Sequence, residues 1–345
     1  MDILIRGDSK GQLQDEASSF FELYSESRIP VSKITPTQKI SLGNRELYLY
    51  RLEKDTILDL GVLEFINAPE HLREIYSMEI NNKNDHLKRT EIMAIVNSTP
   101  DSFYEGSRFL HNMKGLTEIL DQKPDIIDIG GESTRPGSTE VHYEEEIKRL
   151  KPLIEYISGS CDIPISLDTR HPEVLEKFVS EVDIINDISG FRSDRMISIA
   201  AENDLECVLM HMKGTPENMN QFTSYSNIFL EISEFFMERI NQMLEKGVRK
   251  GNIILDPGIG FSKTYQQNLQ LLKNIRRFDF GLRTLVGASR KSFIGRITGE
   301  KPEGRLSGSL AAAVWCSING VSIVRTHDPG ETRKALDVVS AIRGI

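Results

Sequence analysis

The sequence predicts an α/β protein: a (β/α)8 TIM barrel preceded by a small α+β N-terminal module. From residue 92 onward, eight short apolar runs rich in Ile, Val and Leu alternate with connecting stretches that are usually long enough for a helix. Nearly every run ends in a polar or charged residue. Continuous apolar runs of this length are typical of parallel strands buried on both faces. Eight such units in about 250 residues match the size of a (β/α)8 barrel.

The strands predicted in chain order are residues 92–98, 125–131, 164–169, 183–189, 207–212, 252–258, 283–289 and 321–328. Helical spacing of apolar residues, with start and stop signals, indicates helices at 143–157, 172–180, 227–246, 266–276, 305–319 and 330–342. A barrel of this kind builds its active site at the C-terminal ends of the strands. Those ends carry Asn97, Asp128, Glu132, Asp168, Asn186, His211, Asp256, Ser289, Arg325 and His327.

Residues 1–88 lie outside this alternation. They contain apolar stretches at 3–5, 46–52 and 57–66, a possible helix near 12–25, and the start of another at 69–75. This mixture favours a small α+β module of unknown role. The polar segment 81–90 is the natural linker, so we expect a module at 1–88 and a barrel at 89–345.

Composition and charge narrow the class of protein. The chain has 345 residues and a formal net charge of −9, which disfavours nonspecific binding to nucleic acid or to anionic membranes. No apolar stretch approaches the length of a membrane span, and the first residues lack the features of a signal peptide. The three cysteines are far apart, in or beside apolar runs, which favours free thiols in a reducing compartment. We therefore expect a cytoplasmic enzyme with no nucleic-acid or membrane partner.

Two predicted loops at the catalytic end are rich in turn residues and hydrogen-bond donors. Residues 97–106 read NSTPDSFYEG, a segment that can order around a charged ligand as active-site lids do. Residues 130–137 read GGESTRPG, in which paired glycines let the backbone approach a ligand and Ser, Thr and Arg suit an anion. Ordinary turn-rich connections are the alternative explanation for both.

Asp168, Asn186 and Asp256 each follow apolar residues at a strand end. Burial makes a bare carboxylate costly, so each carboxylate needs a partner. The guanidine-like edge of a heterocycle presents several adjacent N–H donors and would satisfy two carboxylates and an amide. Structural pairing with lysines and arginines at the barrel mouth is the alternative.

The last two predicted strands end in basic and hydroxyl side chains. Ser289 and Lys291 follow the seventh strand, and Arg325 and His327 close the eighth. Barrels often hold phosphate in these two loops, so the sequence favours a phosphorylated or carboxylated substrate over a merely solvated surface. His211 is consistent with either catalysis or a hydrogen-bonded core histidine. No His-x-His or Cys-x-x-Cys spacing indicates a tightly held transition metal.

Four phrases taken together resemble the dihydropteroate synthases, a family of pterin-binding barrels. They are Asn-x-Thr-Pro-Asp-Ser-Phe, Gly-Gly-Glu-Ser-Thr-Arg-Pro-Gly, Asp-Pro-Gly-x-Gly-Phe and Ser-Arg-Lys-Ser, and the resemblance runs from about residue 92 to residue 342. It implies an enzyme of folate synthesis that joins p-aminobenzoate to 6-hydroxymethyl-7,8-dihydropterin diphosphate and releases diphosphate. It also implies Mg2+ as cofactor and a homodimer.

The resemblance also implies roles for residues at the matching positions. The pterin would be held by Asp168, Asn186, Met212, Asp256, Phe261, Lys263 and Lys291. The diphosphate would contact Thr134, Arg325 and His327, with Asn97 helping to bind the magnesium. The p-aminobenzoate would meet Phe103, Pro136 and Ser289. The residues closest to the reaction would be Asn97, Glu105, Thr134, Arg135 and Lys291.

The first loop departs from the family pattern at three positions. Ser98 stands where valine is usual, Glu105 stands where aspartate is usual and is longer by one methylene group, and Ser107 replaces a glycine, which can stiffen the loop.

Two rival functions share parts of the family pattern. One rival is a methyltransferase that passes the methyl group of methyltetrahydrofolate to a corrinoid protein. It needs neither a diphosphate nor an aminobenzoate pocket, so the basic residues Arg135, Lys291, Arg325 and His327 favour the synthase. The other is a non-catalytic pterin-binding scaffold, against which the intact set of strand-end residues argues.

Overall fold

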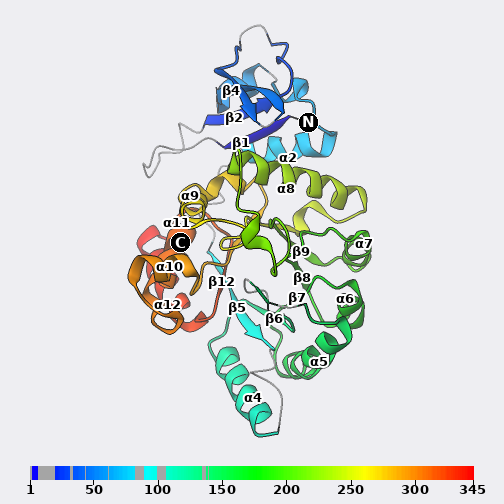
Figure 1. Cartoon of the computed structure of the whole chain (residues 1–345), viewed down its shortest axis with the longest axis vertical. Coiled ribbons are helices and arrows are strands. Elements are labelled where there is room, and N and C mark those ends of the chain that lie inside the picture. Colours follow the sequence, from blue (N-terminus) through cyan, green and yellow to red (C-terminus); the bar gives the residue numbers. More distant parts are fainter. Residues whose placement is uncertain are drawn as a thin grey trace.

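The computed structural model contains the predicted barrel (Figure 1). It describes residues 2–6, 20–31, 34–42, 44–60, 62–81, 89–98, 106–133, 137–138 and 140–345. Eight parallel strands close in the order β10-β11-β12-β5-β6-β7-β8-β9, so each strand pairs with its sequence neighbours and the last pairs with the first. All eight predicted apolar runs form barrel strands.

The barrel strands are β5 (Glu91–Asn97), β6 (Ile126–Gly130), β7 (Ile165–Asp168), β8 (Ile184–Asp187), β9 (Glu206–Met210), β10 (Ile253–Asp256), β11 (Arg283–Val286) and β12 (Ile323–Thr326). The outer helices are α4 (Gly106–Asp121), α5 (Tyr143–Ser160), α6 (Pro172–Phe178), α7 (Asp194–Glu202), α8 (Ile228–Glu245), α9 (Tyr265–Lys273), α10 (Ser292–Thr298), α11 (Leu306–Ile318) and α12 (Pro329–Arg343). The six predicted helices are present, and α4, α7 and α10 add to them.

The barrel interior changes from apolar to polar along the strands. Its lower part is a buried cluster formed by Met93, Ile126, Ile184, Val208, Ile254, Leu285 and Ile323. Side chains two residues apart on a strand face the same side. Four of the seven next inward positions toward the C-terminal ends are polar, namely Asp128, Asn186, Asp256 and Arg325, which we call the polar layer. The apolar cluster supports this layer from below.

The N-terminal segment forms the predicted α+β module. Its antiparallel sheet has the order β1-β2-β4-β3, from β1 (Ile3–Arg6), β2 (Phe20–Ser25), β3 (Gln38–Leu42) and β4 (Arg45–Glu53). The helices α1 (Lys54–Asp59), η2 (Val62–Phe65) and α2 (Glu70–Asn81) follow. The predicted start of a helix at 69–75 is confirmed by α2.

The helix predicted near residues 12–25 is wrong for its last six residues. Residues 20–25 are the central strand β2, which pairs with β1 on one side and β4 on the other. Strand pairing on both sides satisfies the backbone of this segment, and this tertiary gain overrides a local helical pattern. Residues 12–19 lie outside the described residues.

The module packs against one flank of the barrel, along α8 and the short helix η6 (Ile275–Phe278) (Figure 1). The Nη2 of Arg277 lies 2.5 Å from Oε2 of Glu22, and the Nη1 of Arg45 lies 2.7 Å from Oε1 of Glu234. Buried apolar residues of the module and of the outer barrel form one continuous cluster. The division between residues 88 and 89 stays a prediction.

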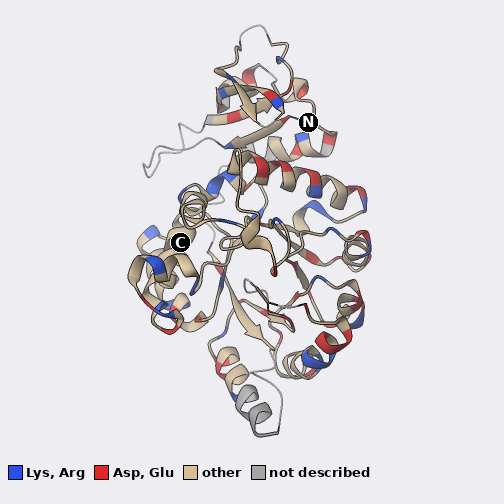
Figure 2. Cartoon of the chain, viewed as in Figure 1, with Lys and Arg blue, Asp and Glu red and all other residues tan. Residues whose placement is uncertain are grey.

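Acidic and basic residues are interspersed along the outer helices (Figure 2). None of the described helices has the length and apolar character needed to cross a membrane. All three cysteines are free thiols, with Cys207 and Cys316 buried and Cys161 partly exposed.

Candidate active site

A buried ion-pair network occupies the mouth of the barrel. The Arg325 Nε donates to Oδ2 of Asp128 at 2.5 Å, and its Nη2 donates to Oδ2 of Asp168 at 2.8 Å. The side chain of Arg325 is 18% exposed, whereas those of Asp128 and Asp168 are 0% and 4% exposed. One guanidinium therefore faces two carboxylates that have almost no access to water.

Two further donors complete the environment of Asp128. The Ser166 hydroxyl donates to Oδ1 at 2.6 Å, and the Asn186 amide donates to both carboxylate oxygens at 3.2 and 3.3 Å. Asp168 is less well satisfied, because its Oδ1 is buried and has no hydrogen-bond partner among the described residues. A buried oxygen without a donor is costly, so a ligand N–H directed at Asp168 would be strongly favoured.

The electrostatics of Asp168 follow from this burial. Loss of solvation, and then repulsion by Asp128, raise the Asp168 pKa to about 8, although the Arg325 charge acts in the opposite direction. At neutral pH the free site therefore holds a proton on this carboxyl group. A perturbed carboxyl group in a concave site is typical of a functional position.

Asp256 lies at the end of β10 beside two lysines. Its Oδ1 accepts a 2.7 Å hydrogen bond from the Gly258 backbone. Burial raises the pKa of Asp256, while Lys291 and that hydrogen bond act to lower it. Burial also lowers the pKa of Lys291 to about 8, with the nearby Asp256 opposing the shift.

The predicted Asp-Pro-Gly-x-Gly-Phe phrase is a tight turn that only glycine fits. Gly258 and Gly260 have φ of 69° and 87°. A Cβ on Gly258 would lie 2.2 Å from the backbone oxygen of His211, and one on Gly260 would lie 2.9 Å from Cδ of Lys291. The turn can therefore bring Lys291 against this backbone, where its Nζ donates to the Ile259 carbonyl.

One wall of the site is apolar. Ile188, Met210, Met212 and Met219 form a buried cluster with Phe261 packed against it. The Nζ of Lys291 lies 4.5 Å from the centre of the Phe261 ring. A wall of thioethers and an aromatic ring beside buried carboxylates suits a flat heterocycle with polar edges.

Lys263 and His211 form a buried pair behind this wall. The Lys263 Nζ lies 3.0 Å from Nδ1 of His211 and donates to the Phe261 carbonyl at 2.9 Å. Burial, followed by the charge of Lys263, lowers the pKa of His211 well below its ordinary value. His211 is thus a hydrogen-bonded neutral histidine inside the protein, the core alternative that its sequence position left open.

The loops after β11 and β12 meet at a hydroxyl. The Ser289 Oγ accepts a hydrogen bond from the His327 backbone at 3.2 Å and lies 3.1 Å from its Nδ1. Next to it, Arg290 makes a two-pronged ion pair with Asp328 at 2.5 and 3.0 Å. The structure thus brings the predicted Ser289 and His327 together, and Arg290 fixes the two loops to each other.

The remaining predicted positions belong to the first two loops. Asn97 ends β5 with an exposed side chain, in register with Gly130 of β6. Ser98 is buried, and its hydroxyl donates to the Arg149 carbonyl at 3.2 Å. The other five predicted residues lie outside the described residues: Phe103, Glu105, Thr134, Arg135 and Pro136.

The sequence pointed to Asp128 as a strand-end residue without giving it a role. The structure places it at the centre of the network, in contact with Arg325, Asn186 and Ser166. The signal was available, because Asp128 lies two residues beyond the inward-facing Ile126 and hence on the same side of β6. Because Asp128 is a charged residue at an inward barrel position, it indicates a functional site more strongly than Glu132, which lies beyond the end of β6.

Fold and site together define a barrel enzyme that binds a flat, nitrogen-rich ring at the C-terminal ends of its strands. Residues 93–327 match the family model described as pterin binding enzyme. The chain is 40% identical over 260 residues to the dihydropteroate synthase of Escherichia coli K12, covering 74% of this chain and 92% of that one. It belongs to the dihydropteroate synthase family of pterin-binding enzymes.

Solved structures agree with this assignment. The dihydropteroate synthase of Yersinia pestis in a sulfonamide drug complex superposes with a TM-score of 0.71 at 36% identity, over 75% of this chain and 96% of that one. The Xanthomonas albilineans dihydropteroate synthase with 4-aminobenzoic acid gives 0.70 at 37% identity, over 75% and 95%. These relatives do not support the methyltransferase alternative, and the match to the family model begins at residue 93, after the N-terminal module.

Proposed function

We propose that this chain makes 7,8-dihydropteroate by joining p-aminobenzoate to 6-hydroxymethyl-7,8-dihydropterin diphosphate, with release of diphosphate. The observation that carries the proposal is the buried Oδ1 of Asp168, which has no donor in the part of the chain that the structure describes and belongs to a network of carboxylate and amide side chains. A dihydropterin presents adjacent ring and amino N–H groups at the spacing that such a network accepts.

In this proposal the pterin lies between the polar layer and the apolar wall. Asp168, Asn186 and Asp256 bind its polar edges, while Met212 and Phe261 contact the ring face. Lys291 lies against Phe261 and near Asp256, so it can donate to a ring acceptor. Lys263 supports the same turn from behind through its contact with the Phe261 carbonyl.

The chemical task is to stabilise the leaving diphosphate. Loss of diphosphate from the methylene group leaves a cation that the pterin ring delocalises, and the carboxylates of the site favour that charge. Arg325 and His327 are assigned to donate where the departing oxygens gain negative charge, a preorganised form of electrostatic stabilisation, and Thr134, which lies outside the described residues, is assigned to the same oxygens. Lys291 is a further charged residue assigned to this step, together with Arg135 and Glu105, whose roles rest on the sequence alone. The arylamine attacks as a neutral nucleophile, so no strong general base is needed.

Asn97, the residue assigned to magnesium, offers the kind of ligand atom that this ion prefers. Mg2+ prefers oxygen ligands, usually keeps several waters, and takes one or two protein ligands together with substrate phosphates. The Asn97 side chain supplies an amide oxygen at the exposed end of β5. When bound there, the ion would neutralise charge on the diphosphate.

The p-aminobenzoate site is assigned to Phe103, Pro136 and Ser289. The Ser289 hydroxyl is 7% exposed as a residue and lies at the junction of the two loops that follow β11 and β12. It is thereby positioned to donate to a carboxylate that enters between these loops. Phe103 and Pro136 would supply apolar contacts to the aromatic ring.

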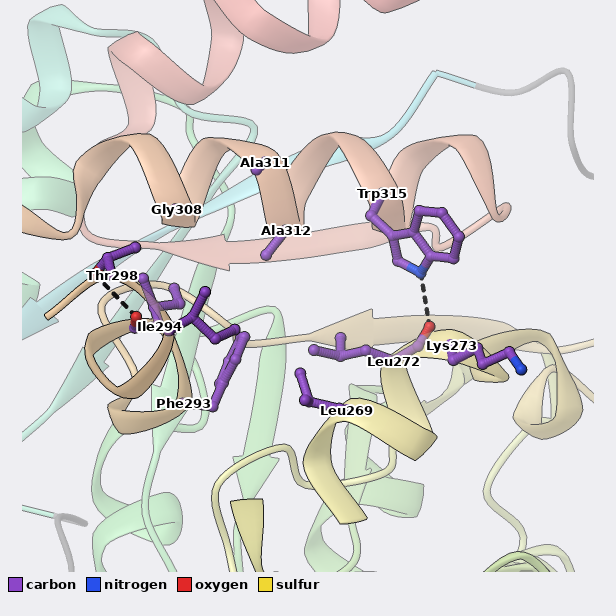
Figure 3. Close-up of a pocket in the computed structure, with 11 residues that line it drawn as sticks. Leu269, Leu272, Lys273, Phe293, Ile294, Thr298, Gly308, Ala311, Ala312 and Trp315 are labelled. Carbon is purple, nitrogen blue, oxygen red and sulfur yellow. Dashed lines mark hydrogen bonds between the residues drawn. The ribbon is translucent and has the colours of Figure 1, made fainter. Parts of the chain in front are cut away.

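We further propose that the protein is a cytoplasmic homodimer. Between α9, α10 and α11 lies an apolar cavity of about 450 Å³, lined by residues that include Leu269, Phe293, Ile294 and Trp315 (Figure 3). Ile297 and Trp315 on its edge are 59% and 45% exposed, although the indole of Trp315 donates to the Leu272 carbonyl at 2.7 Å. An apolar patch of this kind is typical of a protein interface, and a second copy of the chain is the occupant we propose.

The test of the reaction is diphosphate release by the purified protein with Mg2+ and the dihydropterin diphosphate, with and without p-aminobenzoate. We expect formation of dihydropteroate that depends on the arylamine. Asn97→Ala and Lys291→Ala should each reduce turnover strongly. Tight pterin binding without turnover would instead favour the non-catalytic scaffold.

A further inference from the structure

A second cluster of charged residues lies beside the active site, between β6, β7 and α5. It consists of Glu132, Glu140, Glu146, Arg170 and His171, which we call the loop clamp. Arg170 and His171 follow β7 directly after Asp168 and Thr169, while Glu146 belongs to α5. Glu132 and Glu140 flank the segment that contains Thr134, Arg135 and Pro136.

Arg170 contacts both ends of that segment. Its Nε and Nη2 donate to the two oxygens of Glu132 at 3.3 and 2.8 Å, and its Nη2 lies 3.5 Å from Oε1 of Glu140. The side chains of Arg170 and Glu132 are only 16% and 8% exposed, whereas that of Glu140 is 63% exposed. The planar guanidinium fork suits this double contact, which a lysine could not reproduce.

His171 connects the outer end of the segment to α5. Its Nδ1 lies 2.8 Å from Oε2 of Glu146, and its Nε2 lies 3.3 Å from Oε1 of Glu140. Glu146 is fully buried, and its other oxygen has no hydrogen-bond partner among the described residues. The Glu146 carboxylate therefore depends on His171 for its hydrogen bond.

Both ring nitrogens of His171 face carboxylate oxygens, so both must carry a proton to donate. Only the imidazolium form does this. The hydrogen bond to Glu146, followed by its negative charge and by Glu140 and Glu132, raises the pKa of His171 above its ordinary value despite partial burial. Arg170 is the cation next to His171 in the sequence, but its charge is already paired with Glu132 and Glu140.

The loop clamp is not a metal site. Ligand atoms of Glu132, Glu146 and His171 lie within 4.8 Å of one another. However, both oxygens of Glu132 are already occupied by the Arg170 guanidinium, and Glu146 is occupied by His171. Arg170 and His171 thus take up three of the four carboxylate oxygens of Glu132 and Glu146, which leaves one oxygen for a metal ion.

We propose that Arg170 and His171 are positioning residues that hold the two ends of segment 132–140 and so fix how it presents its catalytic positions to substrate. The inference rests on the proposed function, because those positions are assigned to the diphosphate and p-aminobenzoate. Arg170 fixes both ends to each other, and His171 fixes the Glu140 end to α5. Among the described residues, neither Glu140 nor His171 contacts Asp168 or a residue of the polar layer, so we expect the pterin pocket to depend on them only weakly.

A pH dependence follows from the two contacts of His171. When the imidazolium loses a proton, one nitrogen remains a donor and the other becomes an acceptor that faces a carboxylate. The buried Glu146 has the shorter contact and no other donor among the described residues, so the Glu140 contact is the one lost. The KM for p-aminobenzoate should therefore rise as the pH passes upward through the His171 pKa.

The experiment compares Glu140→Gln, His171→Gln and Arg170→Lys with Glu144→Gln as a matched control. Glu144 is an exposed glutamate close by in the first turn of α5 and lies outside the loop clamp. The kcat and the KM for p-aminobenzoate are measured from about pH 6 to about pH 9, the range around a raised histidine pKa. Affinity for the unphosphorylated 6-hydroxymethyl-7,8-dihydropterin is measured alongside, and thermal unfolding checks that each variant is folded.

We expect Glu140→Gln and His171→Gln to raise the KM for p-aminobenzoate about tenfold near pH 6, the order of effect of one lost charge-assisted hydrogen bond. Their pH step should vanish, and pterin affinity should stay within about twofold of wild type, because uncoupled sites do not share binding energy. Arg170→Lys should show a partial loss, and Glu144→Gln should keep the wild-type KM and pH step. If Glu140→Gln and His171→Gln keep the wild-type values, or if pterin affinity falls as far as the KM rises, the positioning role is wrong. A wild-type enzyme that makes no dihydropteroate would instead refute the proposed function.

Discussion

Arg325 and Asp128 lie 197 residues apart in the chain, yet the Nε of Arg325 donates to Oδ2 of Asp128 at 2.5 Å inside the barrel. Their strands, β12 and β6, both pair with β5, so the inward side chains of the two strands lie within reach across a single intervening strand. The same guanidinium also holds Asp168. Closure of the barrel, rather than any local motif, therefore forms the centre of the candidate site.

Removing the guanidinium should destabilise the fold. Arg325→Met leaves the Asp128 carboxylate buried without its cation and removes the hydrogen bond to Asp168, and breaking a buried ion pair from one side costs about 3 to 5 kcal/mol. We expect the free energy of unfolding, measured in urea, to fall by about 3 kcal/mol. Arg195→Met is the control, because Arg195 pairs with Glu173 and Glu176 on the surface, where such pairs contribute about 0 to 1 kcal/mol. Equal losses in the two variants would show that the Arg325 network adds nothing beyond a surface pair.

Pterin binding should release a proton. In the free protein the Asp168 pKa is raised to about 8, so the carboxyl group is protonated at neutral pH. A ligand N–H that donates to the carboxylate favours the ionised form and lowers this pKa. We expect calorimetric titrations with a dihydropterin at about pH 7, in two buffers of different ionisation enthalpy, to show proton release. Asp168→Asn should bind weakly with no such release. Identical apparent enthalpies in both buffers for the wild type would contradict the prediction.

The same group makes the stability of the free protein depend on pH. The Asp168 pKa is about 8 in the folded protein against an ordinary value of 3.8. A raised folded-state pKa contributes stability that is fully present below the unfolded pKa and is lost as the pH rises through the folded pKa. The free energy of unfolding of the wild type, relative to Asp168→Asn, should therefore fall between about pH 4 and about pH 8. A difference that stays flat across this range would show that Asp168 is ionised in the free site.

Two glycine substitutions should change stability in opposite directions. Gly258→Ala forces φ of 69° on a residue with a Cβ that would meet the His211 carbonyl oxygen at 2.2 Å. We expect a loss of more than about 2 kcal/mol, since steric overlap adds to the backbone strain. Gly115→Ala, inside α4 with open space around the new methyl group, should gain about 0.5 to 1 kcal/mol. Chemical denaturation of both variants tests whether Gly258→Ala lowers and Gly115→Ala raises the free energy of unfolding. Pterin binding is measured for Gly258→Ala as well.

Local patterns were sufficient to predict the barrel and to single out candidate site residues at the ends of its strands. Buried strands such as β8 and β10 are uninterrupted apolar runs that end in a polar residue, so strand and site residue were visible together. The pairing partners were not visible. Nothing around Asp128 indicates Arg325, and nothing around Arg170 indicates Glu132 or Glu140, because these contacts depend on barrel closure and on the path of a loop.

The N-terminal sheet shows the other limit of local reasoning. The stretch around Phe21 and Leu23 has a spacing that a helix could also use, and its two β partners lie elsewhere in the module. The choice between helix and strand was therefore made by tertiary pairing. No motif in this module indicates its role. Its contacts with α8 and η6 nevertheless allow a test of which residues attach it to the barrel.

The docking of the module should depend on a buried ion pair. Glu22 accepts hydrogen bonds from Arg277 at 2.5 Å and from the Tyr24 hydroxyl at 2.8 Å, and the Arg277 guanidinium lies 4.5 Å from the centre of the Phe229 ring. Glu22→Gln leaves Arg277 buried with weakened pairing, which costs about 3 kcal/mol. We expect faster hydrogen exchange in β1 and β2 with unchanged exchange in β7 and β8. Glu46→Gln removes an exposed pair with Lys39 and should leave both regions as in wild type.

The apolar face between α9, α10 and α11 gives the last prediction. Ile297 is 59% exposed at the edge of the cavity shown in Figure 3, and a charge placed there would be desolvated on association. Ile297→Asp should therefore weaken a dimer by about 2 to 4 kcal/mol, the cost of an unpaired charge at an interface, and yield monomers in sedimentation at micromolar concentration. Val338→Asp, on α12 at 60% exposure and outside the lining of that cavity, is the matched control and should remain dimeric. A wild type that sediments as a monomer would remove the homodimer proposal, and a dimer insensitive to Ile297→Asp but broken by Val338→Asp would move the interface to α12.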